Sequence, residues 1–329
     1  MSHPERHLPN SVGDRLGVRH SGWSEPGPLA SVSWNGGTIG FAENAAARKV
    51  ATMSQPSERP FVCPEGLDFL KLISEQEDTC EAETRRHIPG MGKKTPACLQ
   101  NLGTVLSLLD RIASCFWACR GGDHVIEYLA GRVCSSSRAA LRLLLFGFYD
   151  ESLSITRSIG EIANLFLLFN QDTPALAQWL QSNNKQRKEQ FSPVKVRLRL
   201  EEIGQRKSVN LRILTVDEQR YGALCEAATH VTPHTKPQAH NPLGLPFAGA
   251  EFQEAGVIVA LNELARATAL ALTPIPKLLG YDDQRRSEIQ GAAVTLLESV
   301  GAVDVITKGQ VFAEMWQQTE KDSEKGERA

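Results

Sequence analysis

The sequence predicts a mainly α-helical protein that forms one large helical bundle domain. From about residue 64 onward, apolar residues recur at spacings of three and four, which is the pattern of helices that bury one face. Strand-like alternation is confined to VKVRLRL at 194–200 and VNLRILTV at 209–216, which leaves room for one short hairpin. A chain of 329 residues that is 41% hydrophobic can bury a core without a partner.

The first sixty residues differ in composition from the rest. They are rich in Gly, Pro and Ser and show no sustained helical or strand period. We therefore expect residues 1–60 to be a poorly ordered extension, residues 61–320 to be the helical domain and residues 321–329 to be a charged tail. The sequence around Met53 also suggests that the native protein starts there, with residues 1–52 read in frame from upstream.

The helices are expected in the following order. The first, at 64–87, opens with proline and acidic residues and closes on a basic cluster, so its terminal charges complement the helix dipole. The second, at 97–120, ends before a pair of glycines. Further helices are expected at 123–149, 150–170, 174–188, 215–231, 251–273, 282–300 and 309–320. The sequence QDTP ends the helix at 150–170, and TPIP ends the helix at 251–273.

The charge distribution limits the possible partners. The formal net charge is −2 with acidic and basic residues mixed along the chain, so any contact with RNA must be local rather than made by a broad basic surface. The longest apolar stretches are interrupted by Arg142 or by Glu263 and Arg266, and no signal-peptide pattern is present. We expect a cytoplasmic protein that has no membrane partner.

The cysteines and the common binding motifs indicate no resident cofactor or metal. Seven cysteines form no CxxC pair, which argues against a disulfide framework and a zinc finger. Cys115 and Cys119 are one helical turn apart and could meet a metal, but their apolar neighbours favour a place in the core. The phosphate-binding motifs GxxxxGK[ST] and GxGxxG and the esterase motif GxSxG are absent.

A narrow polar stripe runs along the helix expected at 150–170. At about 100° per residue, one sector collects Asp150, Ser154, Arg157, Ser158, Glu161 and Asn164, and the remaining circumference is mainly apolar. One interpretation is that Arg157 and Glu161 pair with each other on a narrow exposed face. The other is that they line a site, in which Arg157 holds an anion and Glu161 orients it or acts as a base.

Three histidines, His230, His234 and His240, follow in the stretch YGALCEAATHVTPHTKPQAHN at 221–241. His230 is expected at the C-terminal end of a helix, with Glu226 one turn earlier as a possible ion-pair partner. Pro233 interrupts the helix before His234, and the zinc-protease motif HExxH is absent.

The histidine segment therefore has several interpretations. His230 is a structural helix-end residue, or His230 or His234 belongs to a metal-free polar site that faces Arg157, with histidine as the proton-transfer group. A zinc or manganese site made of Glu226, His230 and His234 requires a loop to bring the last ligand round. We expect His240 to lie at the surface.

These residues carry a resemblance to a known superfamily. The sequence LLLFGFYDESLSITRSIGEIANLFLLF, followed by YGALCEAATHVTPH, resembles uncharacterised bacterial helical proteins in which an Arg-x-x-x-Glu helix precedes a helix ending in a Ser/Thr-x-His-like element. Those proteins are similar to the HEPN superfamily, over residues 100–275 of this chain. The resemblance implies a dimeric helical bundle that acts as a metal-independent ribonuclease in toxin–antitoxin or antiphage systems.

The chain departs from the HEPN pattern in one respect. A HEPN site resembles an arginine followed by four to six residues and a histidine on one helix, whereas Arg220 is ten positions before His230. A match between Arg15 and His20 lies in the expected extension. Under this resemblance, Arg157 supplies the cation from another helix, with Glu161 beside it, and His230 supplies the acid and base, while Asn164, Glu226 and His234 contribute to binding.

Three functions follow as hypotheses. The first is a HEPN-like ribonuclease or effector that contacts RNA locally, forms a homodimer and is controlled by an antitoxin or regulatory protein. The second is a non-catalytic helical binding or regulatory module. The third is a metal-dependent hydrolase that uses Glu226, His230 and His234.

Overall fold

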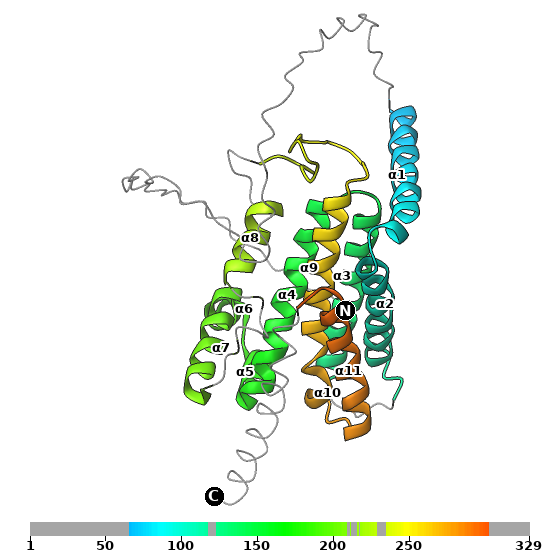
Figure 1. Cartoon of the computed structure of the whole chain (residues 1–329). Coiled ribbons are helices and arrows are strands. Elements are labelled where there is room, and N and C mark those ends of the chain that lie inside the picture. Colours follow the sequence, from blue (N-terminus) through cyan, green and yellow to red (C-terminus); the bar gives the residue numbers. More distant parts are fainter. Residues whose placement is uncertain are drawn as a thin grey trace, which may run out of the picture. The chain divides into compact units, whose positions relative to one another are not determined.

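The computed structural model describes residues 66–117, 123–208, 211, 216, 218–228 and 235–302. Within these residues the protein is helical and contains no strand, which confirms the predicted fold class (Figure 1). The expected extension, Met53, the helix at 309–320 and the charged tail lie outside the described residues.

Helices make up most of the described part of the chain. They are α1 (Leu67–His87), η1 (Ile88–Gly90), α2 (Lys94–Ala113), α3 (Val125–Leu145), α4 (Tyr149–Gln171), α5 (Thr173–Gln181), α6 (Asn184–Gln190), α7 (Pro193–Lys207), α8 (Glu218–Ala228), α9 (Glu254–Leu272), α10 (Ile275–Leu278) and α11 (Asp283–Ser299).

Helix α4 lies between two groups of helices. On one side it packs against α3 and α9, which form a bundle with α2 and α11 (Figure 1). On the other side it contacts α7 and α8. Because helices cover it on both sides, most of its circumference is buried, from Tyr149 at its start to Gln171 at its end. The prediction that this helix is enclosed on most sides is confirmed.

Helix α9 owes its close packing to small residues. Its buried face includes five alanines, and Thr268 shares a buried hydrogen bond of 2.9 Å with Ser137 of α3. The stretch from Glu254 to Leu278 is long and apolar enough to cross a membrane, and it is the one such helix among the described residues, but 67% of its apolar window is buried in the bundle. Core packing therefore accounts for its hydropathy.

Several helix boundaries differ from the sequence prediction. The strand-like stretch 194–200 lies within α7, where Pro193 starts the helix and Val196, Leu200 and Ile203 form its buried stripe. The second strand-like stretch, 209–216, lies mostly outside the described residues. The expected hairpin is therefore wrong in its first strand, because a short alternating stretch also satisfied the helical period.

Three further corrections concern the ends and the number of helices. The helix expected at 174–188 is divided into α5 and α6 because Asn183 forms a capping box with Gln186 and starts a new helix. The helix expected at 97–120 ends at Ala113, so Cys115 follows the helix and does not belong to its core face. A short helix, α10, follows TPIP, where only a break was expected.

The starts of α4 and α9 are locked together by one tyrosine. The Tyr149 hydroxyl accepts a hydrogen bond from the backbone N–H of Gln253 at 2.9 Å and donates one to the carbonyl of Glu251 at 3.2 Å. A Cβ atom at Gly256 would lie 2.5 Å from Cδ2 of the Tyr149 ring. The absence of a side chain at Gly256 therefore lets the two helices meet.

Gly256→Ala is expected to destabilise the protein by about 1–3 kcal/mol, because the new methyl group overlaps the buried Tyr149 ring. Gly103→Ala in α2 is the matched control: its Cβ meets nothing within 4 Å. Alanine there should stabilise the helix by about 0.5–1 kcal/mol. Denaturant unfolding of the two variants measures both effects, and a destabilisation of equal size would contradict this account of Gly256.

The buried thiol of Cys98 predicts a loss of stability at alkaline pH. Burial raises the pKa of this thiol from 9.0 to about 11. Below pH 9 the thiol is protonated in both states; above it the unfolded chain ionises first, so stability falls as the pH rises toward 11. The loss is about 1.4 kcal/mol at pH 10. Unfolding of wild type and Cys98→Ala between pH 8 and pH 10 tests it, since equal slopes would exclude this thiol as a source.

Candidate functional site

The polar stripe of α4 meets α8 at a cluster made of Arg157, Glu161 and Tyr221. Arg157 Nη2 lies 3.1 Å from Glu161 Oε1. The Tyr221 hydroxyl accepts a hydrogen bond from Arg157 and donates one of 2.8 Å to Glu161 Oε1. The Arg157 and Glu161 side chains are only 21% and 30% exposed. The structure therefore brings the two predicted residues together and adds a tyrosine that the sequence prediction missed.

A second arginine reaches the same tyrosine from α7. The Arg157 guanidinium carbon lies 4.5 Å from the centroid of the Tyr221 ring, and that of Arg197 lies 4.3 Å from it. Both contacts are within the range of cation–π attraction. Among the described residues, Arg197 forms no ion pair with a carboxylate. The cluster thus holds two guanidinium groups and one carboxylate.

Each arginine also has a buried nitrogen for which the described residues provide no acceptor. Arg157 Nε and Arg197 Nη1 are both buried and have no hydrogen-bond partner in the described part of the chain. An unsatisfied donor of a charged group is costly to bury. Two guanidinium groups beside one ring concentrate positive charge, and each has hydrogen-bonding capacity that its neighbours do not use.

The pKa shifts in the cluster favour the charged arginine and the neutral tyrosine. Burial alone would lower the pKa of Arg157, but the hydrogen bond to Tyr221 and the charge of Glu161 outweigh it and raise the pKa. Burial, and then the hydrogen bond to Glu161 and its charge, raises the pKa of Tyr221 against the opposing effect of Arg157. The tyrosine is therefore a hydrogen-bond donor and not a base near neutral pH.

Asn164 attaches the start of the α8 segment to α4. Its side chain accepts a hydrogen bond of 2.9 Å from the backbone N–H of Val216 and donates one of 3.1 Å to the Val216 carbonyl. A Cβ at Gly160 would lie 2.7 Å from Val216 Cγ2. Both polar groups of the buried Asn164 amide thus contact the backbone, and this geometry gives it a structural role.

Of the remaining predicted residues, the structure describes Glu226. Glu226 is exposed on α8, and one residue before it Cys225 is buried. Arg220, ten positions before His230, is engaged by Glu263 of α9 at 2.8 Å. His230 and His234 lie outside the described residues. Their roles stay predictions.

The start of α4 carries a second polar network, which the sequence prediction missed. Gln238, which has a left-handed backbone with φ of 50°, accepts hydrogen bonds from the backbone N–H groups of Tyr149 and Asp150 at 2.8 and 3.3 Å. Asp150 accepts a hydrogen bond of 2.8 Å from the Gln238 N–H, and its other oxygen lies 2.8 Å from His240 Nε2. The sequence expectation of a surface His240 is corrected: its side chain is 20% exposed.

One group of metal-type ligands occurs among the described residues, away from the α4 stripe. Cys115, His124 and Glu127 present a sulfur, a nitrogen and an oxygen that all lie within 4.8 Å of one another. Cys115 follows the end of α2, His124 is the N-cap of α3, and Glu127 lies in the first turn of α3. The sequence indicated Cys115, together with Cys119, as a residue that could meet a metal, but it did not indicate His124 or Glu127.

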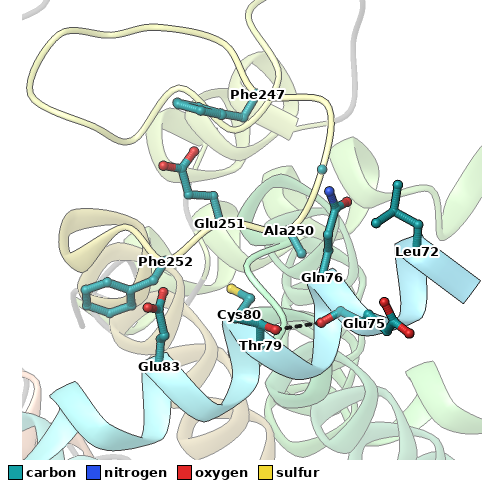
Figure 2. A pocket seen from close by; sticks show the side chains of 11 residues that line it. Leu72, Glu75, Gln76, Thr79, Cys80, Glu83, Phe247, Ala250, Glu251 and Phe252 are labelled. Atoms are coloured by element: carbon teal, nitrogen blue, oxygen red, sulfur yellow. Dashed lines mark hydrogen bonds between the residues drawn. The ribbon is translucent and has the colours of Figure 1, made fainter. Parts of the chain in front are cut away.

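A cavity of about 570 Å³ lies between α1 and the loop before α9 (Figure 2). Three carboxylates, those of Glu75, Glu83 and Glu251, line it together with Phe247 and Phe252. Its acidic lining repels phosphate groups. The cavity is therefore a poor place for RNA, in contrast to the arginines beside Tyr221.

Comparison of the chain with protein-family models, with curated proteins and with solved structures found no match.

A double-mutant cycle on Tyr221 and Glu161 measures how strongly the cluster is coupled. Tyr221→Phe keeps the ring under both guanidinium groups but removes the hydroxyl. Glu161→Gln removes the negative charge of the side chain that accepts the hydrogen bond of this hydroxyl. We expect a coupling free energy of about 0.5–1 kcal/mol in denaturant unfolding. The control cycle on the exposed pair Lys71 and Glu75, whose atoms are 3.9 Å apart, should give a value near zero. Equal coupling in both cycles would contradict the cooperative cluster.

Proposed function

We propose that the protein is a HEPN-like, metal-independent ribonuclease or effector that binds an RNA phosphate beside Tyr221. The observation that carries the proposal is the pair of guanidinium groups of Arg157 and Arg197 over this ring, each with a buried nitrogen that lacks an acceptor. An RNA phosphate offers several acceptor oxygens and the opposite charge.

The charges of the cluster support anion binding. Glu161 compensates one guanidinium group, so the cluster keeps one positive charge in excess. The side chains are only partly exposed, and screening by water and salt is therefore weaker than at an open surface. A local site of this kind fits a protein whose formal net charge is −2, because no broad basic surface is needed.

In the proposed reaction, His230 transfers the proton and the arginines stabilise the negative charge of the phosphate. His230 takes the proton from a ribose 2′-hydroxyl, and the 2′-oxygen forms a bond to the adjacent phosphorus. The bond between phosphorus and the 5′-oxygen breaks, and His230 returns the proton to the departing 5′-oxygen. The arginines stabilise the negative charge that develops on the phosphate oxygens. The products carry a 2′,3′-cyclic phosphate and a 5′-hydroxyl. Glu161 holds Arg157 and Tyr221 in position.

A second candidate function is a non-catalytic binding or regulatory module. It is favoured by the mutual contacts of Arg157, Tyr221 and Glu161, which satisfy most of their polar groups without a ligand. In this case the arginine pair binds an anionic partner and no bond is broken. Both functions fit a cytoplasmic homodimer that is controlled by an antitoxin or regulatory protein, and these partners belong to the proposal.

RNA cleavage by the purified full chain in EDTA tests the proposal. A short single-stranded RNA should be cut by the wild type and yield cyclic phosphate ends. His230→Ala should slow cleavage by about 100-fold or more, and Arg157→Ala should slow it by about 100–1,000-fold. Arg197→Ala should weaken RNA binding and make it less dependent on salt, because one phosphate contact is lost.

Arg85→Ala is the control for the loss of an arginine. Arg85 pairs with Glu81 four residues earlier on α1, as Arg157 pairs with Glu161 on α4, but it lies over no tyrosine. This variant should cut RNA at the wild-type rate. If the protein binds RNA without cutting it, and the arginine variants weaken this binding, the result would support the regulatory module. Cleavage that requires a divalent metal and is lost in Glu226→Gln would support the metal-dependent hydrolase.

A further inference from the structure

We propose that Cys115, His124 and Glu127 form a binding site for Zn²⁺ at the connection between α2 and α3. The site shares no residue with the arginine cluster of α4 and α7, and the inference goes beyond the proposed function.

Two of the three separations between the ligand atoms match those of a tetrahedral zinc site, and the third, between Cys115 and Glu127, is at most 4.8 Å. Cys115 Sγ lies 3.5 Å from His124 Nδ1, and His124 Nδ1 lies 3.6 Å from Glu127 Oε1. Zinc bonds of about 2.3 Å to sulfur and about 2.0–2.1 Å to nitrogen and oxygen place neighbouring tetrahedral ligands roughly 3.3–3.6 Å apart. One ion can therefore reach these atoms without a large rearrangement.

The direction of the contacts argues against a catalytic triad. In a cysteine–histidine–carboxylate triad, the sulfur and the carboxylate face different nitrogens of the imidazole. Here both face Nδ1 of His124. A single nitrogen has either one proton or one lone pair in the ring plane, so it cannot serve both partners at once. Convergence of three atoms on one point is instead the arrangement that a cation requires.

The backbone conformations of Cys115 and His124 provide an independent observation. Cys115 has φ of 53° and His124 has φ of 49°, in the left-handed region that non-glycine residues rarely adopt. Cys115 occupies the position after α2 at which the equivalent ends of α3, α10 and α11 have Gly147, Gly280 and Gly301. The chain thus has a cysteine where glycine would fit with less strain, and such strain concentrates at functional sites.

The burial of the Glu127 carboxylate also favours a bound cation. The residue is 7% exposed and its side chain is 10% exposed. Within the described residues its carboxylate lies 3.6 Å from His124 Nδ1, which is longer than a hydrogen bond. A mostly buried carboxylate is stabilised by a positive charge close to it. A bound cation provides that charge.

The ligand types select the metal. A thiolate, an imidazole and a carboxylate suit Zn²⁺, whereas Mg²⁺ and Ca²⁺ prefer oxygen ligands alone. Cys115 and His124 are partly exposed, so solvent reaches the ion and supplies a further ligand. The bound ion would join the end of α2 to the start of α3.

A zinc titration of the EDTA-treated and dialysed full chain tests the site. At a hundredfold excess of free Zn²⁺ over its dissociation constant, the Tm of the wild type should rise by roughly 5–10 °C. Co²⁺ should give a thiolate charge-transfer band at one ion per chain. Glu127→Gln should weaken zinc binding at least tenfold, because it replaces a charged ligand by a neutral amide of the same shape.

Cys115→Gly separates metal binding from folding. Without metal its Tm should equal or exceed that of the wild type, because glycine suits the left-handed position, while the zinc-dependent rise and the cobalt band should be lost. Cys134→Ala, which removes a buried thiol of α3, should keep both signals. A wild type that shows no zinc-dependent rise, or a rise of equal size in Cys115→Gly and Glu127→Gln, would overturn the proposal.

Discussion

The enclosure of α4 is the constraint on which the rest of the structure depends. A helix that is covered on both sides exposes few of its polar groups to water, so these groups are stabilised by partners within the protein. Asp150 finds one in the loop that holds Gln238 and His240, and Asn164 finds one in the backbone of Val216. Polar contacts therefore help to attach the segments around α8 to α4, in addition to the packing of α4 against α3 and α9.

The same constraint explains why the arginines meet at Tyr221. A tyrosine presents a ring that attracts cations and a hydroxyl that bonds a carboxylate, so it can accommodate Arg157, Arg197 and Glu161 together. An aliphatic residue at this position would leave three charged groups with fewer partners. The cluster stabilises the contact between α4, α7 and α8. It also concentrates positive charge where the side chains are only partly exposed to solvent.

The helical fold was predictable because the spacing of buried apolar residues along a helix is a local feature of the sequence. The helix expected at 150–170 lies at Tyr149–Gln171, and its polar stripe was visible from spacing alone. The partners of the stripe were not predictable: Tyr221 is 64 residues from Arg157, and His240 is 90 residues from Asp150. Local spacing carries no information about such pairs. The early end of α2 was missed because Cys115 occupies a position that glycine usually marks.

The attachment of α8 has a consequence for access to the arginines. Among the α8 side chains that the structure describes, only Leu224 and Cys225 are buried, so this helix contributes less apolar contact than α4 or α9. Segments with few buried apolar contacts open locally at a lower free energy than the whole domain unfolds. Opening of α8 would remove Tyr221 from Arg157 and Arg197 together and leave two charged groups uncovered at once. The local stability of α8 would thus set how often Arg157 and Arg197 are exposed to solvent.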